Sequence, residues 1–334
     1  MSLLINAWGE ISDSKIEIVF GEKTEFDATL ILWPDSILEK CLTSFSYRLL
    51  KVLRPLKKSA VANHYLEFLV DRECRNIRLI KGPVYWQIHE ISGHHIPIEI
   101  QHLDQKIRQE IIYKSEAIFI TEESTQLPIE NVFDTYRKEI SVSHLGGYRN
   151  YYKEGSDLAS ARMKFGIPLT KPTILIFGRA RKTVDFTAIF KPLIDQGYFM
   201  VFAGQGYETS QFDDTKCLNI SRFVKKDDVA ELFSSVDYVL KPEQDYLNSG
   251  VIRLAISYHK PVIAHRFGAT EDLAKNCLIE LGDPDWLTKI PNRNSKKYKE
   301  MVEAAKLRDE ERDWRLSAQV IHDKIWEYWE AKSK

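Results

Sequence analysis

Residues 241–265, KPEQDYLNSGVIRLAISYHKPVIAH, contain the pattern that decides the fold. They predict a strand end, a polar loop, a helix, a turn and a buried strand in close succession. Asn248 or Ser249 stands at the helix start, where side chains of these types commonly cap a helix, and Gly250 follows. Backbone N–H groups at such a helix end attract anions. The stretch therefore predicts a site for a phosphate or carboxylate, or else an ordinary βαβ unit without a ligand.

Strand and helix patterns alternate along the whole chain. Short apolar runs bounded by charged or turn residues predict the strands, and helical periodicity predicts the helices between them. The predicted strands are Leu3–Ala7, Ile16–Phe20, Ala28–Trp33, Ile77–Ile80, Tyr85–Ile88, Ala117–Ile120, Ile140–His144, Thr173–Phe177, Phe199–Ala203, Leu218–Ile220 and Tyr238–Leu240. The predicted helices are Asp35–Arg54, Asn63–Asp71, His102–Lys114, Leu158–Phe165, Val184–Gln196 and Asp227–Ser234. This alternation indicates an α/β fold with two Rossmann-like, doubly wound domains facing a cleft.

The domain junction is predicted near residues 151–170, where the short amphipathic helix Leu158–Phe165 precedes Gly166, Ile167 and Pro168. We expect 1–152 to form the first Rossmann-like domain and 153–310 the second. The tail of the chain has a helical period with one apolar face. Since such a face must be covered, residues 311–334 are predicted to form a helix that packs back across the domains.

The composition excludes several classes of protein. A net charge of −1 gives no reason to expect nucleic acid as a partner. The four cysteines are scattered without metal-type spacing, which favours a reduced, cytoplasmic chain. No apolar run is long enough to span a membrane, and the first residues lack the pattern of a secretion signal.

A basic turn follows the predicted strand Thr173–Phe177. Gly178 permits close backbone approach, and Arg179, Arg181 and Lys182 then place three cations at the carboxyl end of the strand. The two arginines are suited to a diphosphate, although a solvated basic turn has the same composition. Gly204, after the next strand, either lines a base or sugar pocket or forms a tight turn.

Residues 170–275 resemble the nucleotide-sugar-binding domain of GT-B glycosyltransferases of the glycogen-synthase-like family. The resemblance rests on four ordered segments, TILIFGRARK, VFAGQGYE, SRFVKKDDVAELFSSVDYVLKP and HKPVIAHRFGATEDL. It implies a GT-B fold, a UDP- or GDP-sugar donor, and no cofactor or bound metal beyond that donor. The residues predicted to bind the donor are Gly178, Arg179, Arg181, Lys182, Gly204, Glu243, Tyr246, Asn248, Ser249, Gly250 and Arg253.

Two carboxylates of the family pattern are absent from this chain. Tyr246 and Leu254 occupy the positions where the family commonly carries glutamates, and Val184 occupies the position of a family lysine. Glu243 or Asp245 is a candidate replacement for the lost acids. The sequence therefore predicts binding of the diphosphate at the backbone of Asn248–Gly250, while the family's carboxylates for the ribose and sugar are missing.

The first half carries the candidate catalytic residues. His89 and Glu90 end a predicted strand, and either is suited to accept a proton from an acceptor hydroxyl. The segments around these residues, around Trp33 and around Gly146 resemble a bacterial exopolysaccharide-type subgroup of the same enzymes. The resemblance implies an acceptor site that includes Trp33, His94 and Gly146. A structural role for each of these residues is the alternative.

Two further features of the first half have alternative interpretations. His94, His95 and Glu99 are compatible with a metal site or with a turn that contacts the acceptor, and the resemblance favours the turn. Residues 36–58 form a basic amphipathic segment, which fits either an anionic membrane surface or a core helix with a solvated face.

Taken together, the patterns and the resemblance predict a hexosyltransferase. It would transfer a sugar to a saccharide or lipid-linked acceptor in bacterial surface polysaccharide or glycolipid assembly, in the cytoplasm or at the inner face of the membrane. The missing carboxylates leave a degenerate GT-B protein that binds nucleotide without turnover as one alternative. The others are a GT-B epimerase or phosphorylase-like enzyme and a two-domain binding protein.

Overall fold

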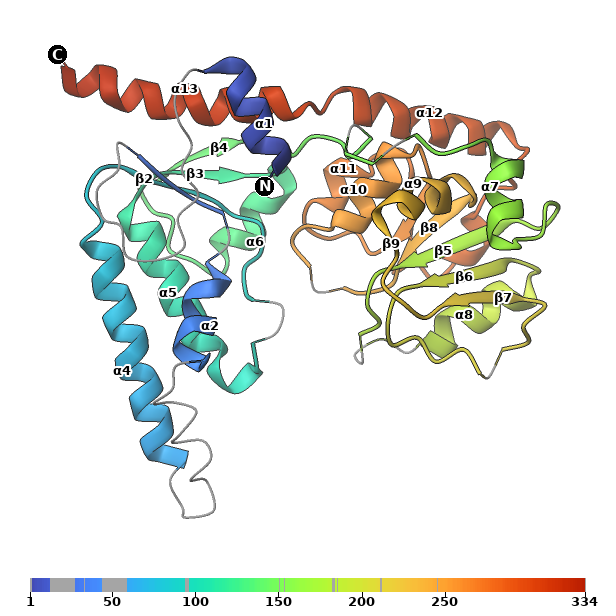
Figure 1. The fold of residues 1–334 in the computed structure, drawn as a ribbon, viewed down its shortest axis with the longest axis horizontal. Coiled ribbons are helices and arrows are strands. Elements are labelled where there is room, and N and C mark those ends of the chain that lie inside the picture. Colours follow the sequence, from blue (N-terminus) through green and yellow to red (C-terminus); the bar gives the residue numbers. More distant parts are fainter. Residues whose placement is uncertain are drawn as a thin grey trace. The chain divides into compact units, whose positions relative to one another are not determined.

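The computed structural model describes residues 2–12, 28–32, 34–43, 59–93, 96–149, 151–152, 154–181, 184, 186–210, 212–244 and 246–333 (Figure 1). Contacts divide the chain into two compact units. The first comprises Met1–Ser143 with Arg315–Lys334, and the second comprises His144–Trp314. The predicted strand Ile16–Phe20 and most of the basic segment 36–58 lie outside the described residues. No helix in the described part of the chain is both long and apolar enough to span a bilayer.

The first unit contains a parallel sheet of four strands in the order β1–β2–β3–β4. Both faces of such a sheet are normally covered, and all four residues of β2 are buried. The strands are β1 (Thr29–Ile31), β2 (Val84–Gln87), β3 (Ser115–Ile120) and β4 (Glu139–Val142). The helices are α1 (Ser2–Ile11), α2 (Asp35–Thr43), α4 (Ser59–Arg78), α5 (Gln101–Lys114) and α6 (Gln126–Glu130).

Two strand predictions in this unit are wrong. Leu3–Ala7 lies in helix α1, where Leu4, Ala7 and Trp8 are buried at helical spacing. Ile77–Ile80 begins inside the last turn of α4, whose buried residues continue the same spacing to Ile77. In both cases a short apolar run is part of the apolar stripe of a longer helix, a period that a window of four or five residues does not reveal.

The end of the chain belongs to the first unit. Helix α13 (Trp314–Ser333) follows α12 (Lys296–Glu310) after a short break, and from Arg315 onward its residues contact the first unit. The hydroxyl groups of Ser317 and Ser143 lie 2.7 Å apart in a buried position, and Lys324 pairs with Glu139 of β4 at 2.6 Å. Ala318 and Ile321 are fully buried. Part of the apolar face of the tail is thus buried in the first unit.

The second unit has six parallel strands in the order β10–β9–β8–β5–β6–β7. This is the doubly wound Rossmann order, in which the sheet grows outward in both directions from its first strand. The strands are β5 (Thr173–Phe177), β6 (Phe199–Ala203), β7 (Cys217–Ile220), β8 (Tyr238–Lys241), β9 (Val262–Ala264) and β10 (Leu278–Glu280). The helices before α12 are α7 (Leu158–Phe165), α8 (Phe186–Asp195), α9 (Lys226–Ser234), α10 (Gly250–Ser257) and α11 (Thr270–Leu273).

Most elements of the second unit begin and end where the sequence predicts. Helix α7 shows why: Asp157 caps its first turn by accepting from the backbone N–H groups of Ala159 and Ser160, and Gly166 ends it with φ of 70°. Strand β10 and the short helix α11 are not among the predicted elements. Helix α11 has four residues and β10 has three, so their patterns are too short to stand out.

A fully buried arginine joins three parts of the second unit. Arg162 of α7 is 0% exposed, and its guanidinium contacts the carboxylate of Asp237, just before β8, at 2.8 Å. The same carboxylate accepts from the backbone N–H of Thr173, the first residue of β5, at 2.7 Å. The remaining guanidinium donors are shared among the backbone carbonyls of Pro168, Leu169, Lys171 and Ser235.

Replacing Asp237 with asparagine should destabilise the second unit strongly. The change keeps the shape of the side chain but leaves the charge of Arg162 buried without a counterion, which should lower the free energy of unfolding by about 3 kcal/mol or more. Urea denaturation measures the loss. Lys191→Met, which removes an exposed i,i+4 pair with Asp195, is the control and should cost less than about 0.5 kcal/mol. Equal effects of the two changes would contradict this role.

Helix α10 ends on a histidine in the left-handed conformation. His259 has φ of 55°, and the N–H groups of His259 and Lys260 bond to the carbonyls of Ile256 and Ala255, as in a Schellman motif. The Nε2 atom of His259 lies 3.2 Å from Nη1 of Arg149, so the neutral ring can accept a hydrogen bond there. Burial, together with the neighbouring positive charges, lowers the pKa of His259 to about 4.

The stability of the second unit should therefore depend on pH through His259. Because its pKa is lower in the folded state, the unfolded chain takes up the proton first as the pH falls. The stabilisation is complete above the ordinary value of 6.5 and is lost as the pH falls toward about 4. His259→Asn, which tolerates the left-handed conformation, should flatten this part of the stability profile measured by urea denaturation. An unchanged slope between these pH values would refute the assignment.

Candidate functional site

The candidate site lies at the carboxyl ends of β5 and β8. These two strands are neighbours at the centre of the second sheet, and the order of strands reverses direction between them. Ligands of open α/β sheets bind outside the carboxyl ends of the strands at such a switch point. Gly178 and Arg179 follow β5, and Lys241 ends β8. The sequence therefore places a glycine and an arginine after β5, and a lysine at the end of β8, on the two sides of the switch point.

The loops after β5 and β6 are joined to each other by backbone hydrogen bonds. Gly178 N donates to Ala203 O, and Ala180 N donates to Gln205 O, each at 2.9 Å. Gly178 and Gly204 have φ of 111° and 144°. A Cβ atom on Gly204 would lie 1.7 Å from the carbonyl oxygen of Gly178. Gly204 is thus required for the close approach of the two loops, which supports the tight-turn interpretation of this residue.

The third loop of the site ends in a capped helix. Ser249 is the N-cap of α10, and its Oγ accepts from the N–H of Ile252 at 3.3 Å. Gly250, the first helical residue, is exposed, and a Cβ atom added to it would meet no other atom within 4 Å. A helix start with open space around its first backbone groups is suited to an anion. The loop is held from behind, since Ala269 N donates to Leu247 O at 2.8 Å.

A buried ion pair stands beside this loop. Lys241 Nζ lies 2.6 Å from Glu243 Oε2, and both side chains are about nine-tenths buried. The ammonium group also lies 4.9 Å from the ring centroid of Tyr246. Glu243, one of the residues predicted to bind the donor, is the ion-pair partner of Lys241 in the structure. Lys241 is a candidate site residue that the sequence patterns do not single out, because in the sequence it only marks the end of a strand.

Tyr246, another residue predicted to bind the donor, is buried and contacts a threonine. Its side chain is 2% exposed, and its hydroxyl group lies 3.3 Å from Oγ1 of Thr270. Leu254 is also buried. Both positions of the missing carboxylate pair thus belong to the hydrophobic core of the unit.

The other predicted residues of the second half differ in their surroundings. Arg179 is exposed and Arg181 half-buried, whereas Lys182 lies outside the described residues. Arg253 is 4% exposed and donates to the backbone carbonyl of Leu145, so it supports the fold at this point. Asn248 is half-buried beside the helix start.

Packing accounts for Gly146, which the sequence assigns to the acceptor site. A Cβ atom at this position would lie 2.4 Å from the ring of Trp314, and Trp314 Nε1 donates to the carbonyl of Gly147 at 2.8 Å. The glycine is needed to let the indole ring lie against the backbone. Its surroundings give no separate support for contact with an acceptor.

The first unit places His89 and Glu90 directly after β2. His89 is 8% exposed, and Glu90 is half-buried. The loop is anchored at its start, where Ile88 N donates to Phe119 O of β3 at 2.8 Å. Farther along, Gly93 N donates to Asp104 Oδ2 of α5 at 3.0 Å. Trp33 and His94, the other acceptor-site predictions in this unit, lie outside the described residues.

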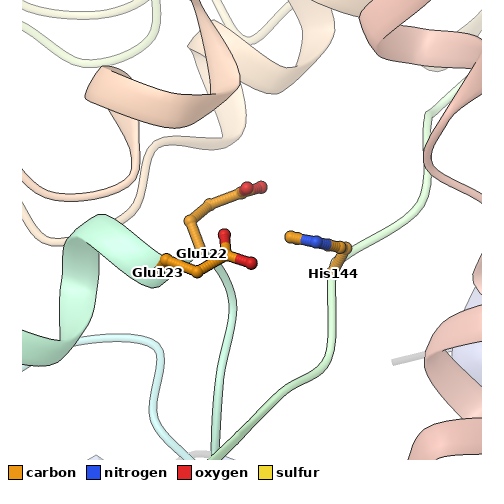
Figure 2. A group of neighbouring side chains, drawn as sticks. All are labelled: Glu122, Glu123 and His144. Atoms are coloured by element: carbon orange, nitrogen blue, oxygen red, sulfur yellow. The ribbon is translucent and has the colours of Figure 1, made fainter.

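One group of side chains in the described part of the chain could hold a metal ion. Glu122 and Glu123 follow β3, and His144 follows β4, which pairs with β3. One ligand atom of each lies within 4.8 Å of the others, and Figure 2 shows the two carboxylates and the imidazole ring pointing toward one another. Oxygen and imidazole ligands suit a divalent cation. The predicted alternative at His94 and His95 lies outside the described residues.

Comparisons with known proteins identify the fold. No family model and no curated protein sequence matches the chain. Among solved structures, Anabaena Alr3699/HepE in complex with UDP and glucose is similar with a TM-score of 0.61 and 14% identity, over 90% of this chain and 100% of that one. Sucrose-phosphate synthase from Thermosynechococcus elongatus is similar with a TM-score of 0.61 and 12% identity, over 80% and 72%. The chain has the GT-B fold.

Within this GT-B chain the two sheets are the two Rossmann-like domains that the sequence predicts. The pneumococcal O-GlcNAc transferase GtfA in complex with UDP and GlcNAc has a similar fold, with a TM-score of 0.54 and 12% identity over 76% of this chain and 54% of that one. At such identities the likeness concerns the fold. The chemistry must be argued from the residues of this chain.

The close approach at Gly204 yields a prediction for the GT-B domain. Gly204→Ala should destabilise the second unit by about 1–3 kcal/mol, because the added carbon collides with Gly178 and the backbone conformation is strained for alanine. Thermal or urea unfolding measures the loss. Gly250→Ala is the matched control and should change stability by no more than about 0.5 kcal/mol, since nothing lies within 4 Å of the added carbon. A neutral Gly204→Ala would contradict the tight-turn assignment.

Proposed function

We propose that this chain is a glycosyltransferase that moves a hexose from a nucleotide-diphosphate sugar to an acceptor hydroxyl. The observation that carries the proposal is the switch point between β5 and β8. Gly178, Arg179, Lys241 and the capped start of α10 lie there, at the carboxyl ends of the strands of a Rossmann sheet. Similar solved structures contain UDP-glucose or UDP, which supports a UDP-sugar as the donor.

The leaving group of this reaction is a nucleoside diphosphate that gains negative charge as the glycosidic bond breaks. The backbone N–H groups at the start of α10 and the guanidinium of Arg179 are the groups that would stabilise that charge. Ser249 contributes by fixing the first turn of the helix. Glu243, held by Lys241, replaces a family carboxylate near the sugar hydroxyls in this proposal.

The first unit would supply the acceptor side of the reaction. His89 is the proposed base that takes the proton from the attacking hydroxyl, and Glu90 is the other candidate. A saccharide or lipid-linked acceptor in surface polysaccharide or glycolipid assembly fits the resemblance of the segments around Trp33, His89 and Gly146. A peripheral position at an anionic membrane through residues 36–58 belongs to the same proposal, and the binding of vesicles rich in anionic lipid would test it.

A second candidate function is nucleotide binding without turnover. It is favoured by the absence of a carboxylate at either position of the family pair, since these positions hold Tyr246 and Leu254, both buried. The two functions differ in a single assay. Incubation with a panel of labelled UDP- and GDP-sugars should give slow donor hydrolysis, and faster transfer when an acceptor is present, if the chain is an enzyme. Tight binding without turnover supports the second candidate, and no nucleotide binding refutes both.

Arg179→Ala should weaken the binding of the nucleotide sugar. Loss of a charge-assisted hydrogen bond to the diphosphate should raise the dissociation constant about tenfold or more, as measured by isothermal titration calorimetry. Lys171→Ala is the control, because Lys171 is a cation next to the opposite end of β5, where its Nζ contacts the carbonyl of Thr215. Unchanged affinity in Arg179→Ala, or an equal loss in Lys171→Ala, would remove Arg179 from the diphosphate site.

A further inference from the structure

The first unit also contains a buried ion pair, on helix α5. Asp104 and Arg108 are one helical turn apart, and Arg108 Nε donates to Asp104 Oδ2 at 2.7 Å. Each side chain is only 1% exposed. Apolar residues of similar volume could fill such a position at no loss of stability, because removing two charges from water is costly. The pair therefore invites an explanation beyond the stability of the core.

Both members of the pair bind the loop that carries His89 and Glu90. Asp104 Oδ2 accepts from the backbone N–H of Gly93 at 3.0 Å, and Arg108 Nη1 donates to the backbone carbonyl of Glu90 at 2.9 Å. The start of the same loop is fixed to β3 by the bond between Ile88 N and Phe119 O. The backbone from Ile88 to Gly93 is thus held at its beginning, its middle and its end.

We infer that Asp104 and Arg108 are positioning residues that orient His89 and Glu90 for proton transfer from the acceptor. The inference rests on the proposed glycosyl transfer. A base must lie within hydrogen-bond reach of the proton that it removes, and a displacement of about 1 Å can reduce a rate about a hundredfold. A loop held by neutral backbone contacts alone would be free to tilt. Because the Asp104–Arg108 pair is itself buried in the core, its hydrogen bonds hold the loop backbone in a fixed position.

Other ion pairs of α5 do not share this arrangement. Lys106 pairs with Asp71, and Glu110 pairs with Arg78, so both pairs connect α5 to α4 and neither contacts the His89 loop. Lys106 is about half exposed, in contrast to Arg108. Lys106→Met therefore removes an ion pair from the same helix while leaving the loop contacts in place, which makes it a matched control.

Conservative substitutions separate positioning from stability. Asp104→Asn keeps the size of the side chain but removes the charge that holds Arg108. Arg108→Lys keeps the charge but loses the planar group that reaches Asp104 and the Glu90 carbonyl at once. The measurements are amide hydrogen exchange at Gly93, transfer kinetics at saturating donor, donor dissociation constants and unfolding by urea, with the full chain in each case.

Positioning predicts a specific combination of results. In Asp104→Asn, Gly93 should exchange at least about tenfold faster, kcat for transfer should fall about tenfold to a hundredfold, and the donor dissociation constant should stay within about twofold. Arg108→Lys should lie between this variant and the wild type, and Lys106→Met should match the wild type. Faster exchange at Gly93 with unchanged kcat would overturn the inference and leave the proposed function intact.

Three other outcomes are also decisive. If Asp104→Asn does not fold, Arg108→Lys provides the same comparison, and a kcat equal to that of the wild type in this variant would overturn the inference. If Lys106→Met also lowers kcat in parallel with its loss of stability, lost stability explains the lower kcat of all the variants. The Asp104–Arg108 pair is then structural, and the inference is overturned. A wild-type chain that transfers no sugar from any donor refutes the proposed function, and the inference falls with it.

Discussion

The buried contact between Arg162 and Asp237 is the constraint on which the GT-B site depends. It ties α7 to the starts of β5 and β8, the two strands whose opposite ends form the candidate site. Because the strands are parallel and paired in register, fixing their starts also fixes where their carboxyl ends emerge. Backbone hydrogen bonds then join the loops that follow, first from Gly178 N to Ala203 O and then from Ala269 N to Leu247 O. The Arg162–Asp237 pair at the amino ends of the strands thereby helps to set the geometry at their carboxyl ends.

The two units place buried charge in the same relation to their candidate functional loops. In the second unit the Lys241–Glu243 pair adjoins the loop that leads to α10, and in the first the Asp104–Arg108 pair holds the loop after β2. Apolar residues could occupy the volume of either pair. A shift of the surroundings that separated the charges would lower stability, because a buried charge would lose its partner. In both units a buried ion pair lies next to a loop that carries candidate site residues.

Much of the fold follows from local sequence, and the limits are physical. Thr173–Phe177 and Phe199–Ala203 are predicted to the residue, because strands buried on both faces are continuous apolar runs bounded by turn residues. Leu3–Ala7 is wrong because a short apolar run does not separate strand from helix. At the site, Gly178 and Ser249 are visible in local patterns. The burial of Tyr246 and the contact of Arg108 with Glu90 depend on residues distant in sequence, which no local pattern contains.

The return of α13 to the first unit has a consequence for the order of folding during synthesis. Ser317, Ala318 and Ile321 complete the core and the buried hydrogen bonds of a unit whose other residues end at Ser143. The whole of the second unit is therefore translated before the first can close. In most two-domain chains the amino-terminal domain is finished first. Here the first unit stays incomplete during synthesis until residues 315–334 have been translated. By then every residue of the second unit has already been translated.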